Sequence, residues 1–106
     1  MNYRVEIADS ALQQVRVHAE YITLQAQAPL NAARWLARVF EAIHTLERFP
    51  KRYPVAPQYT LQHSEVRTFN CESFVFFYTI DEQVQTVRVL WARHGRQDDS
   101  RSRLPE

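Results

Sequence analysis

The amino-acid sequence predicts a single α+β domain in which two helices cover one face of an antiparallel sheet. Two observations lead to this fold class. Apolar residues recur at steps of three and four within residues 10–48, whereas they alternate or run together at residues 3–7 and again after residue 64. A helical block followed by a run of strands is typical of α+β proteins. The length of 106 residues is that of one domain.

The composition is that of an ordinary globular protein. Hydrophobic residues make up 45% of the chain and charged residues 24%, and 13 basic against 12 acidic side chains leave a formal net charge of +1. Such a charge gives no overall field for nonspecific nucleic-acid binding. Lys51 is the only lysine, and arginine suits bidentate contact with phosphate or carboxylate. A general arginine preference of the genome explains this bias equally well.

The sequence carries no signal for secretion or for crossing a membrane. Arg4 and Glu6 stand where a signal peptide needs an apolar run, and no apolar run is long enough to span a bilayer. Cys71 is the only cysteine, which excludes an intramolecular disulfide and a zinc site built from cysteines. We therefore expect a cytoplasmic protein.

The first part of the chain predicts one strand and one helix. Residues 3–7 alternate apolar and charged side chains, which is the pattern of a strand with one buried face. Ser10 and Gln13 have the spacing of a helix capping box, and apolar residues then repeat on one helical face. The first helix is expected at residues 10–27, because Pro29 ends it.

A second amphipathic helix is expected at residues 29–48, with Pro29 as its first residue. Because almost nothing separates the two helices, we expect an αα-hairpin. Three prolines within residues 49–57 exclude a helix interior and a central strand. This segment is expected to be an extended, stiff loop.

The C-terminal half predicts a three-stranded antiparallel meander. Its middle strand is apolar on both faces, as expected of a central strand covered on both sides. Strict alternation in the last strand assigns Val87, Val89 and Trp91 to one face. The strands are expected at residues 64–69, 74–80 and 85–93, and the most buried side chains at Leu36, Val39, Ile43, Phe76 and Tyr78.

The folded domain is expected to span residues 1–96. Residues 97–106 are polar and have no periodicity, so we expect a flexible tail. The motifs of common enzymes are missing from the sequence: there is no Gly-rich phosphate loop, no HExxH and no nucleophile elbow. The four histidines are not at metal-ligand spacing. We therefore expect neither a metal nor a cofactor.

One polar constellation remains, formed by Arg67 on the first meander strand and Arg93, His94 and Arg96 at the end of the last strand. An antiparallel meander is able to bring these residues to one sheet edge. Arginines there can clamp a phosphate or carboxylate, and a histidine can transfer a proton near neutral pH. The simpler interpretation is that strand ends are exposed and polar in any case, and spacing alone favours it.

The order and spacing of these segments resemble the ParE branch of the ParE/RelE superfamily of type II toxin–antitoxin toxins. The resemblance extends from Tyr3 to Arg96, and it lies in the arrangement rather than in any single segment. The segments are Tyr3-Arg4-Val5, the helix from Ala11 to Ile22, the helix from Ala32 to Leu46, Pro50, Arg52-Tyr53-Pro54, Val66-Arg67-Thr68-Phe69, Phe74 to Asp81, and Val87 to Arg96.

The resemblance implies a toxin that is held inactive by a cognate antitoxin, whose C-terminal segment wraps the helices and the sheet. Two activities occur in the superfamily. RelE-like members cut messenger RNA on the ribosome without a metal, and ParE-like members poison DNA gyrase without being enzymes. The resemblance to the nucleases implies that Arg67 occupies the position of a phosphate-binding arginine and that Arg96 lies near the position of a second one. In a nuclease, His94 would then transfer the proton.

This sequence departs from the nuclease pattern. RelE-like proteins carry several lysines before the arginine-bearing strand and a tyrosine near the C-terminus, whereas Lys51 is the only lysine here and no tyrosine follows Tyr78. A near-neutral chain is also poorly suited to a ribosomal RNA surface. The sequence therefore favours a gyrase poison whose target contacts are the four residues of the constellation. A ribosome-dependent nuclease is the alternative, and a domain that only binds a partner is a third possibility.

Overall fold

The computed structural model describes residues 2–25, 27–59 and 64–94, so the expected tail and Arg96 lie outside the described residues. None of the helices in these ranges is long and apolar enough to cross a membrane. The elements are β1 (Arg4–Ile7), α1 (Asp9–Leu24), α2 (Pro29–His44), the 3-10 turns η1 (Thr45–Glu47), η2 (Pro50–Arg52) and η3 (Pro57–Tyr59), and the strands β2 (Arg67–Cys71), β3 (Phe74–Asp81) and β4 (Thr86–His94).

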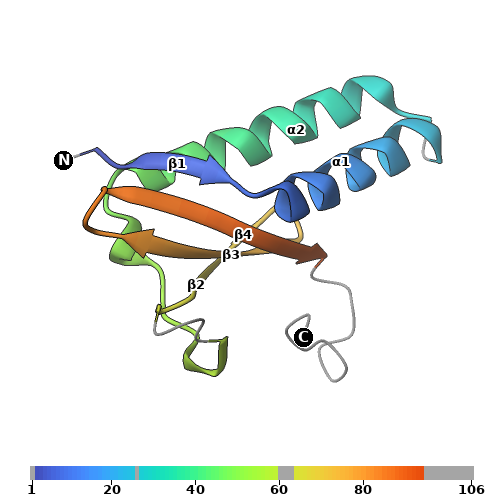
Figure 1. Ribbon diagram of the computed structural model, residues 1–106. Coiled ribbons are helices and arrows are strands. Elements are labelled where there is room, and N and C mark those ends of the chain that lie inside the picture. The colour runs from blue at the N-terminus through green and yellow to red at the C-terminus, as the bar shows by residue number, and fades with distance from the viewer. Residues whose placement is uncertain (1, 26, 60–63, 95–106) are drawn as a thin grey trace.

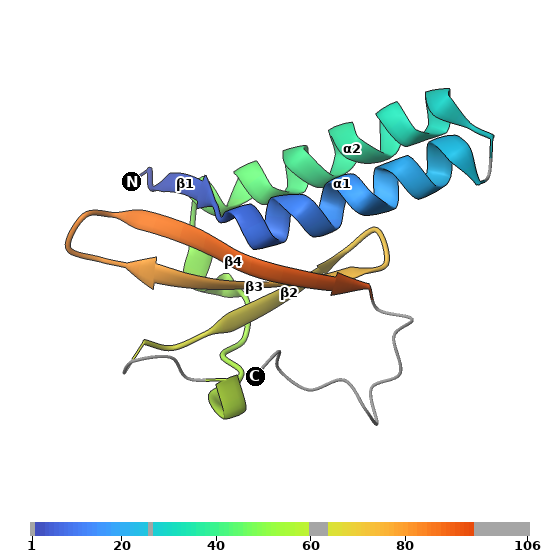
Figure 2. The ribbon, with the colours of Figure 1, turned by 45° about the vertical axis from the view of Figure 1, so that its right-hand side comes forward.

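The strands form one sheet in the order β1-β4-β3-β2. The last three strands are an antiparallel meander, as expected, and β1 pairs with β4 in parallel, so that Arg4 lies opposite Thr86. Figures 1 and 2 show the α1–α2 hairpin lying across one face of this sheet. The predicted α+β fold is therefore confirmed.

The core lies between the hairpin and the sheet. Leu36 is only partly buried, so the prediction that it is among the most buried residues is wrong. Leu36 lines a groove between the two helices, and Trp35 fills the place that faces the sheet, with its ring centroid 5.6 Å from that of Phe74. The other residues expected to be most buried are at most 1% exposed, namely Val39, Ile43, Phe76 and Tyr78.

A β-bulge in β4 changes which side chains face the helices. The register between β3 and β4 shifts after Phe77, which leaves Leu90 as an extra residue in β4. Beyond Leu90 the alternation of faces is inverted, so Ala92 joins the core beneath the helices. Trp91 stacks instead on Phe77 on the opposite face, with ring centroids 4.8 Å apart. The prediction that Trp91 shares a face with Val89 is therefore wrong.

The bulge also anchors the start of α1. The Ser10 hydroxyl donates a hydrogen bond to the Leu90 carbonyl, whereas the N-cap position is Ala8, which has no side-chain cap. The expected capping box of Ser10 with Gln13 is therefore wrong. Because the hydroxyl is bound to a strand carbonyl, it joins the helix to the sheet instead of closing the helix's own end.

The ends of several elements also differ from expectation. Helix α1 ends at Leu24, and the last turn of the second helix tightens into η1. The loop at residues 49–57 is not wholly extended, because Pro50 and Pro57 each begin a 3-10 turn, where a fixed φ and a missing N–H are tolerated. The first strand of the meander begins at Arg67, later than expected.

Candidate functional site

Arg67 begins β2, and its guanidinium is bound to the loop that contains η2. The Nη1 atom donates hydrogen bonds to the carbonyls of Lys51 (3.1 Å) and Tyr53 (2.6 Å). The Nη2 atom lies 3.6 Å from a carboxylate oxygen of Glu65, and the Arg67 side chain is 15% exposed. Much of the guanidinium is thus engaged within the protein, which limits its capacity to grip a phosphate.

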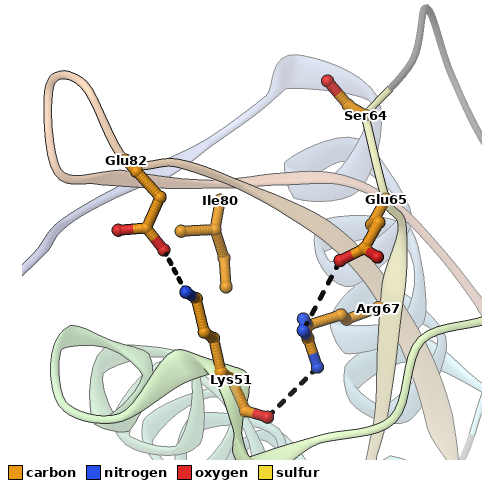
Figure 3. Close-up of a pocket in the computed structure, with 6 residues that line it drawn as sticks. All are labelled: Lys51, Ser64, Glu65, Arg67, Ile80 and Glu82. Atoms are coloured by element: carbon orange, nitrogen blue, oxygen red, sulfur yellow. Dashed lines mark hydrogen bonds and ion pairs between the residues drawn. The ribbon is translucent and has the colours of Figure 1, made fainter.

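A polar pocket of about 250 Å³ opens beside this arginine. Figure 3 shows an ion pair on either side of it, with Ile80 between them. On one side the Lys51 ammonium lies 2.8 Å from the Glu82 carboxylate, which also accepts a 2.8 Å hydrogen bond from the Tyr3 hydroxyl. The other side is formed by the arginine and its carboxylate partner. The lining residues are Lys51, Ser64, Glu65, Arg67, Ile80 and Glu82.

The charges that line this pocket balance one another. Hydrogen bonds from Lys51 and Tyr3 lower the pKa of the Glu82 carboxyl, and the same contact raises the pKa of Lys51. Each partner therefore holds the other in its charged form. With Glu65 opposite Arg67, the lining carries as many carboxylates as cations. A phosphorane dianion would find no excess of positive charge here.

His94 is the last described residue of β4, and it lies in a cluster of rings beneath α1. Its ring centroid is 4.9 Å from that of His18 and 5.3 Å from that of Phe74. His18 in turn lies 4.9 Å from Trp35. Burial, and then the neighbouring His94, lower the pKa of His18, which favours its neutral form. The cluster therefore fastens the end of β4 to the helices.

The structure does not bring the predicted constellation together. Arg67 and His94 pair with residues of β3 that are four positions apart, which is about 13 Å at the rise of a strand. Arg93 lies on the opposite face of the sheet, with its Cζ 5.9 Å from the ring centroid of Phe77. Arg96 lies outside the described residues. The role of these residues in target binding stays a prediction.

The sequence pattern did not reveal that the loop at residues 48–53 belongs to this site. The buried Tyr78 hydroxyl donates a 2.6 Å hydrogen bond to the Pro50 carbonyl. Burial raises the pKa of Tyr78 to about 12, so this group remains a donor at neutral pH. Arg52 donates to two further carbonyls of the same loop. The one signal in the sequence was Lys51, a single lysine within a proline-rich segment.

The described residues contain no cluster of His, Cys, Asp or Glu side chains that could hold a metal ion. Cys71 is partly buried on β2, and burial raises the pKa of its thiol, which makes it a poor nucleophile. The expectation that the function needs neither a metal nor a cofactor stays a prediction.

Comparisons with known proteins agree with the resemblance. The family model for the ParE toxin of the type II toxin–antitoxin system, parDE, matches residues 5–99. The fold is similar to that of a chain in the chromosomal ParDE toxin–antitoxin system of P. aeruginosa, with 15% identity, a TM-score of 0.67, and coverage of 87% of this chain and 95% of that one.

Two further solved structures share the fold. For the toxin–antitoxin complex RelBE2 of Mycobacterium tuberculosis the identity is 23% and the TM-score 0.62, over 92% of this chain and 95% of that one. For the archaeal RelE–RelB complex of Pyrococcus horikoshii the identity is 14% and the TM-score 0.58, over 92% of this chain and 100% of that one. No curated protein matches the sequence.

Proposed function

The chain belongs to the ParE toxin family of type II toxin–antitoxin systems, and from this premise we propose that this toxin arrests growth in the cytoplasm by poisoning DNA gyrase. The toxin contributes binding, and the DNA breaks are left by the chemistry of gyrase itself. The observation that carries this proposal is the dispersal of the groups that a nuclease would need.

A metal-free ribonuclease requires a base, an acid and cations that converge on one phosphate. In this toxin Arg67 is tied to two backbone carbonyls and a carboxylate. His94 lies about 13 Å along the sheet, at the rise of a strand, and its ring packs against His18 and Phe74. This geometry supports action through binding rather than through a chemical step.

Ribosome-dependent cleavage of messenger RNA is the second candidate. It is favoured by the pocket in which Lys51 and Arg67 face the same space. The Lys51 side chain is 62% exposed, and an ammonium group has three donors, of which Glu82 engages one in an ion pair. A phosphate that displaced Glu82 would reach both cations.

The cognate antitoxin is the proposed partner of the helical hairpin. A groove of about 430 Å³ runs between α1 and α2, opened by the small residues Ala19, Ala32 and Ala33. Leu24 at its rim is 68% exposed, so an apolar side chain of a bound segment would remove it from water. The solved neighbours from P. aeruginosa and M. tuberculosis are toxin–antitoxin systems, which supports a partner of this kind.

The test compares the two targets directly with the purified toxin. Gyrase is incubated with supercoiled plasmid, and programmed ribosomes with messenger RNA, each with and without the toxin. Linear plasmid together with intact messenger RNA is the expected result. Cleaved messenger RNA with no effect on gyrase would replace the gyrase proposal with the nuclease.

A further inference from the structure

Phe49 is the most exposed large apolar side chain among the described residues, with 77% of it accessible to water. Its backbone is left-handed, with φ 50° and ψ 52°. A bulky residue rarely adopts this conformation, because its Cβ is crowded by the neighbouring peptide. Folding therefore places an aromatic ring in solvent and strains the backbone that carries it. Neither feature helps the isolated domain.

The left-handed conformation of Phe49 is stabilised by a side chain that donates hydrogen bonds to carbonyls of the same loop. The Arg52 guanidinium donates from Nη1 to the carbonyls of Arg48 (2.6 Å) and Phe49 (3.2 Å), and from Nη2 to the Thr45 hydroxyl (2.9 Å). The guanidinium also lies 4.7 Å from the centroid of the Tyr53 ring. One side chain thus closes the turn on both sides of Phe49.

The rest of the loop is held from the sheet. Tyr78 of β3 donates to the Pro50 carbonyl, and Arg67 of β2 donates to the carbonyls of Lys51 and Tyr53. Tyr78 is fully buried, so this contact is screened from water. These contacts order the loop before any partner arrives, which lowers the entropy cost of binding.

We infer that Phe49 is a preformed anchor with which the toxin binds a folded protein target, by inserting its ring into an apolar pocket of that target. This inference rests on the proposed function, in which the target is gyrase. Aromatic residues, phenylalanine included, are enriched at protein interfaces, and binding energy concentrates in side chains that fill well-packed pockets. A strained conformation retained at the surface is explained if binding, and not stability, depends on it.

The surroundings of Phe49 indicate the chemistry of the pocket that it fits. Arg48 precedes the ring in the sequence, so a carboxylate at the rim of the partner's pocket matches it. A nucleic acid is a poorer match because its phosphates need several available cations. Arg52 already donates hydrogen bonds to backbone carbonyls, and Lys51 is paired with Glu82. A protruding ring also needs a pocket that already exists, which a folded target offers and a segment wrapped over the toxin's surface does not.

The experiment compares Phe49→Ser and Phe49→Gly with the control Leu30→Ser. Leu30 is 61% exposed and lies at the start of α2, at the opposite end of this helix from η1. Growth arrest on controlled expression is measured in cells, and affinity for purified gyrase is measured in solution. We expect both Phe49 variants to lose growth arrest and to bind gyrase at least about tenfold more weakly. Leu30→Ser should match the wild type in both measurements.

Thermal melts separate this role from a structural one. Phe49→Gly relieves a left-handed φ, so this variant should melt at a higher temperature than the wild type while it loses function. Growth arrest by Phe49→Ser equal to that of the wild type would overturn the inference. Loss of stability in both Phe49 variants would do the same, because it would make the ring a packing residue.

Two further outcomes keep the proposals apart. If the wild type arrests growth but does not bind gyrase, the gyrase proposal fails, and growth arrest still decides the role of Phe49. If the wild type binds single-stranded DNA or RNA and Phe49→Ser abolishes that binding, the anchor stacks on a base and the protein-pocket inference is overturned.

Discussion

Replacement of Tyr78 by phenylalanine tests whether the sheet holds the loop at residues 48–53. The change keeps the aromatic ring, which is fully buried. It removes only the hydroxyl, which donates a 2.6 Å hydrogen bond to the Pro50 carbonyl. Loss of one partner leaves a buried acceptor unsatisfied, which costs about 1–3 kcal/mol. For a domain of this size a loss near 2 kcal/mol lowers the Tm by on the order of 10 °C.

The measurement is urea denaturation of the wild type and Tyr78→Phe, followed by circular dichroism. The matched control is Tyr21→Phe, because Tyr21 is 56% exposed and its hydroxyl lies at the surface of α1. Such a surface change should stay within about 0.5 kcal/mol of the wild type. An unchanged m-value would show that Tyr78→Phe alters stability and not the compactness of either state.

A double-mutant cycle adds a sharper criterion. Arg67 donates to carbonyls of the same loop, so the effects of Tyr78→Phe and Arg67→Ala should not add, with a coupling of about 0.5–3 kcal/mol. If Tyr78→Phe is as stable as Tyr21→Phe, the hydroxyl does not fix the loop and the reasoning fails. If the two changes add simply, the two side chains hold independent parts of the molecule.

The remaining predictions concern the core, the histidine cluster, the target and metal independence. Ile43→Ala and Phe76→Ala should each cost about 2–5 kcal/mol in urea melts, because both side chains are at most 1% exposed; a neutral result would contradict the core. Because burial lowers the pKa of His18, its contribution to stability is present above the unfolded pKa of about 6.5 and is lost as pH falls through the lower folded value. His18→Gln should flatten this dependence in melts at several pH values. Arg67→Ala should weaken binding to gyrase by about 1–4 kcal/mol, and His94→Ala should weaken it no more than a substitution at a neighbouring surface residue. If either variant instead cleaves messenger RNA about 100-fold more slowly than the wild type, the nuclease is favoured. Toxin pretreated with a chelator and then dialysed should poison gyrase as well as untreated toxin, with magnesium restored for gyrase itself.

The periodic elements could be predicted from the sequence because their signals are local. The stripe through Val39 and Ile43 and the run through Phe76 predicted one core, and the structure confirms it. The inverted face of Trp91 could not be predicted, because the bulge at Leu90 depends on how β4 pairs with β3 and not on the alternation within β4. Hydrophobic alternation alone cannot detect an inserted residue.

The candidate site was less predictable for the same reason. Lys51 and Glu82 pair across the fold, and so do Pro50 and Tyr78, although each pair is far apart in the sequence. Spacing grouped His94 with Arg67 because both are near strand ends, but the two lie at positions of the meander that the register keeps apart. Such a site is formed by contacts between segments that are distant in the sequence, and the periodicity of a single sequence carries no information about those contacts.

The parallel pairing of β1 with β4 has a consequence for the synthesis of this toxin. Strand β4 lies between β1 and β3, yet among the strands of the described residues it is made last. The first strand therefore pairs with a neighbour that is made long after it, and such pairing between distant segments slows folding. A nascent chain that lacks β4 cannot close the sheet, and one that also lacks β3 has no Tyr78 to hold the loop at residues 48–53. Complete folding of the toxin therefore depends on the synthesis of β4, although β1 is made first.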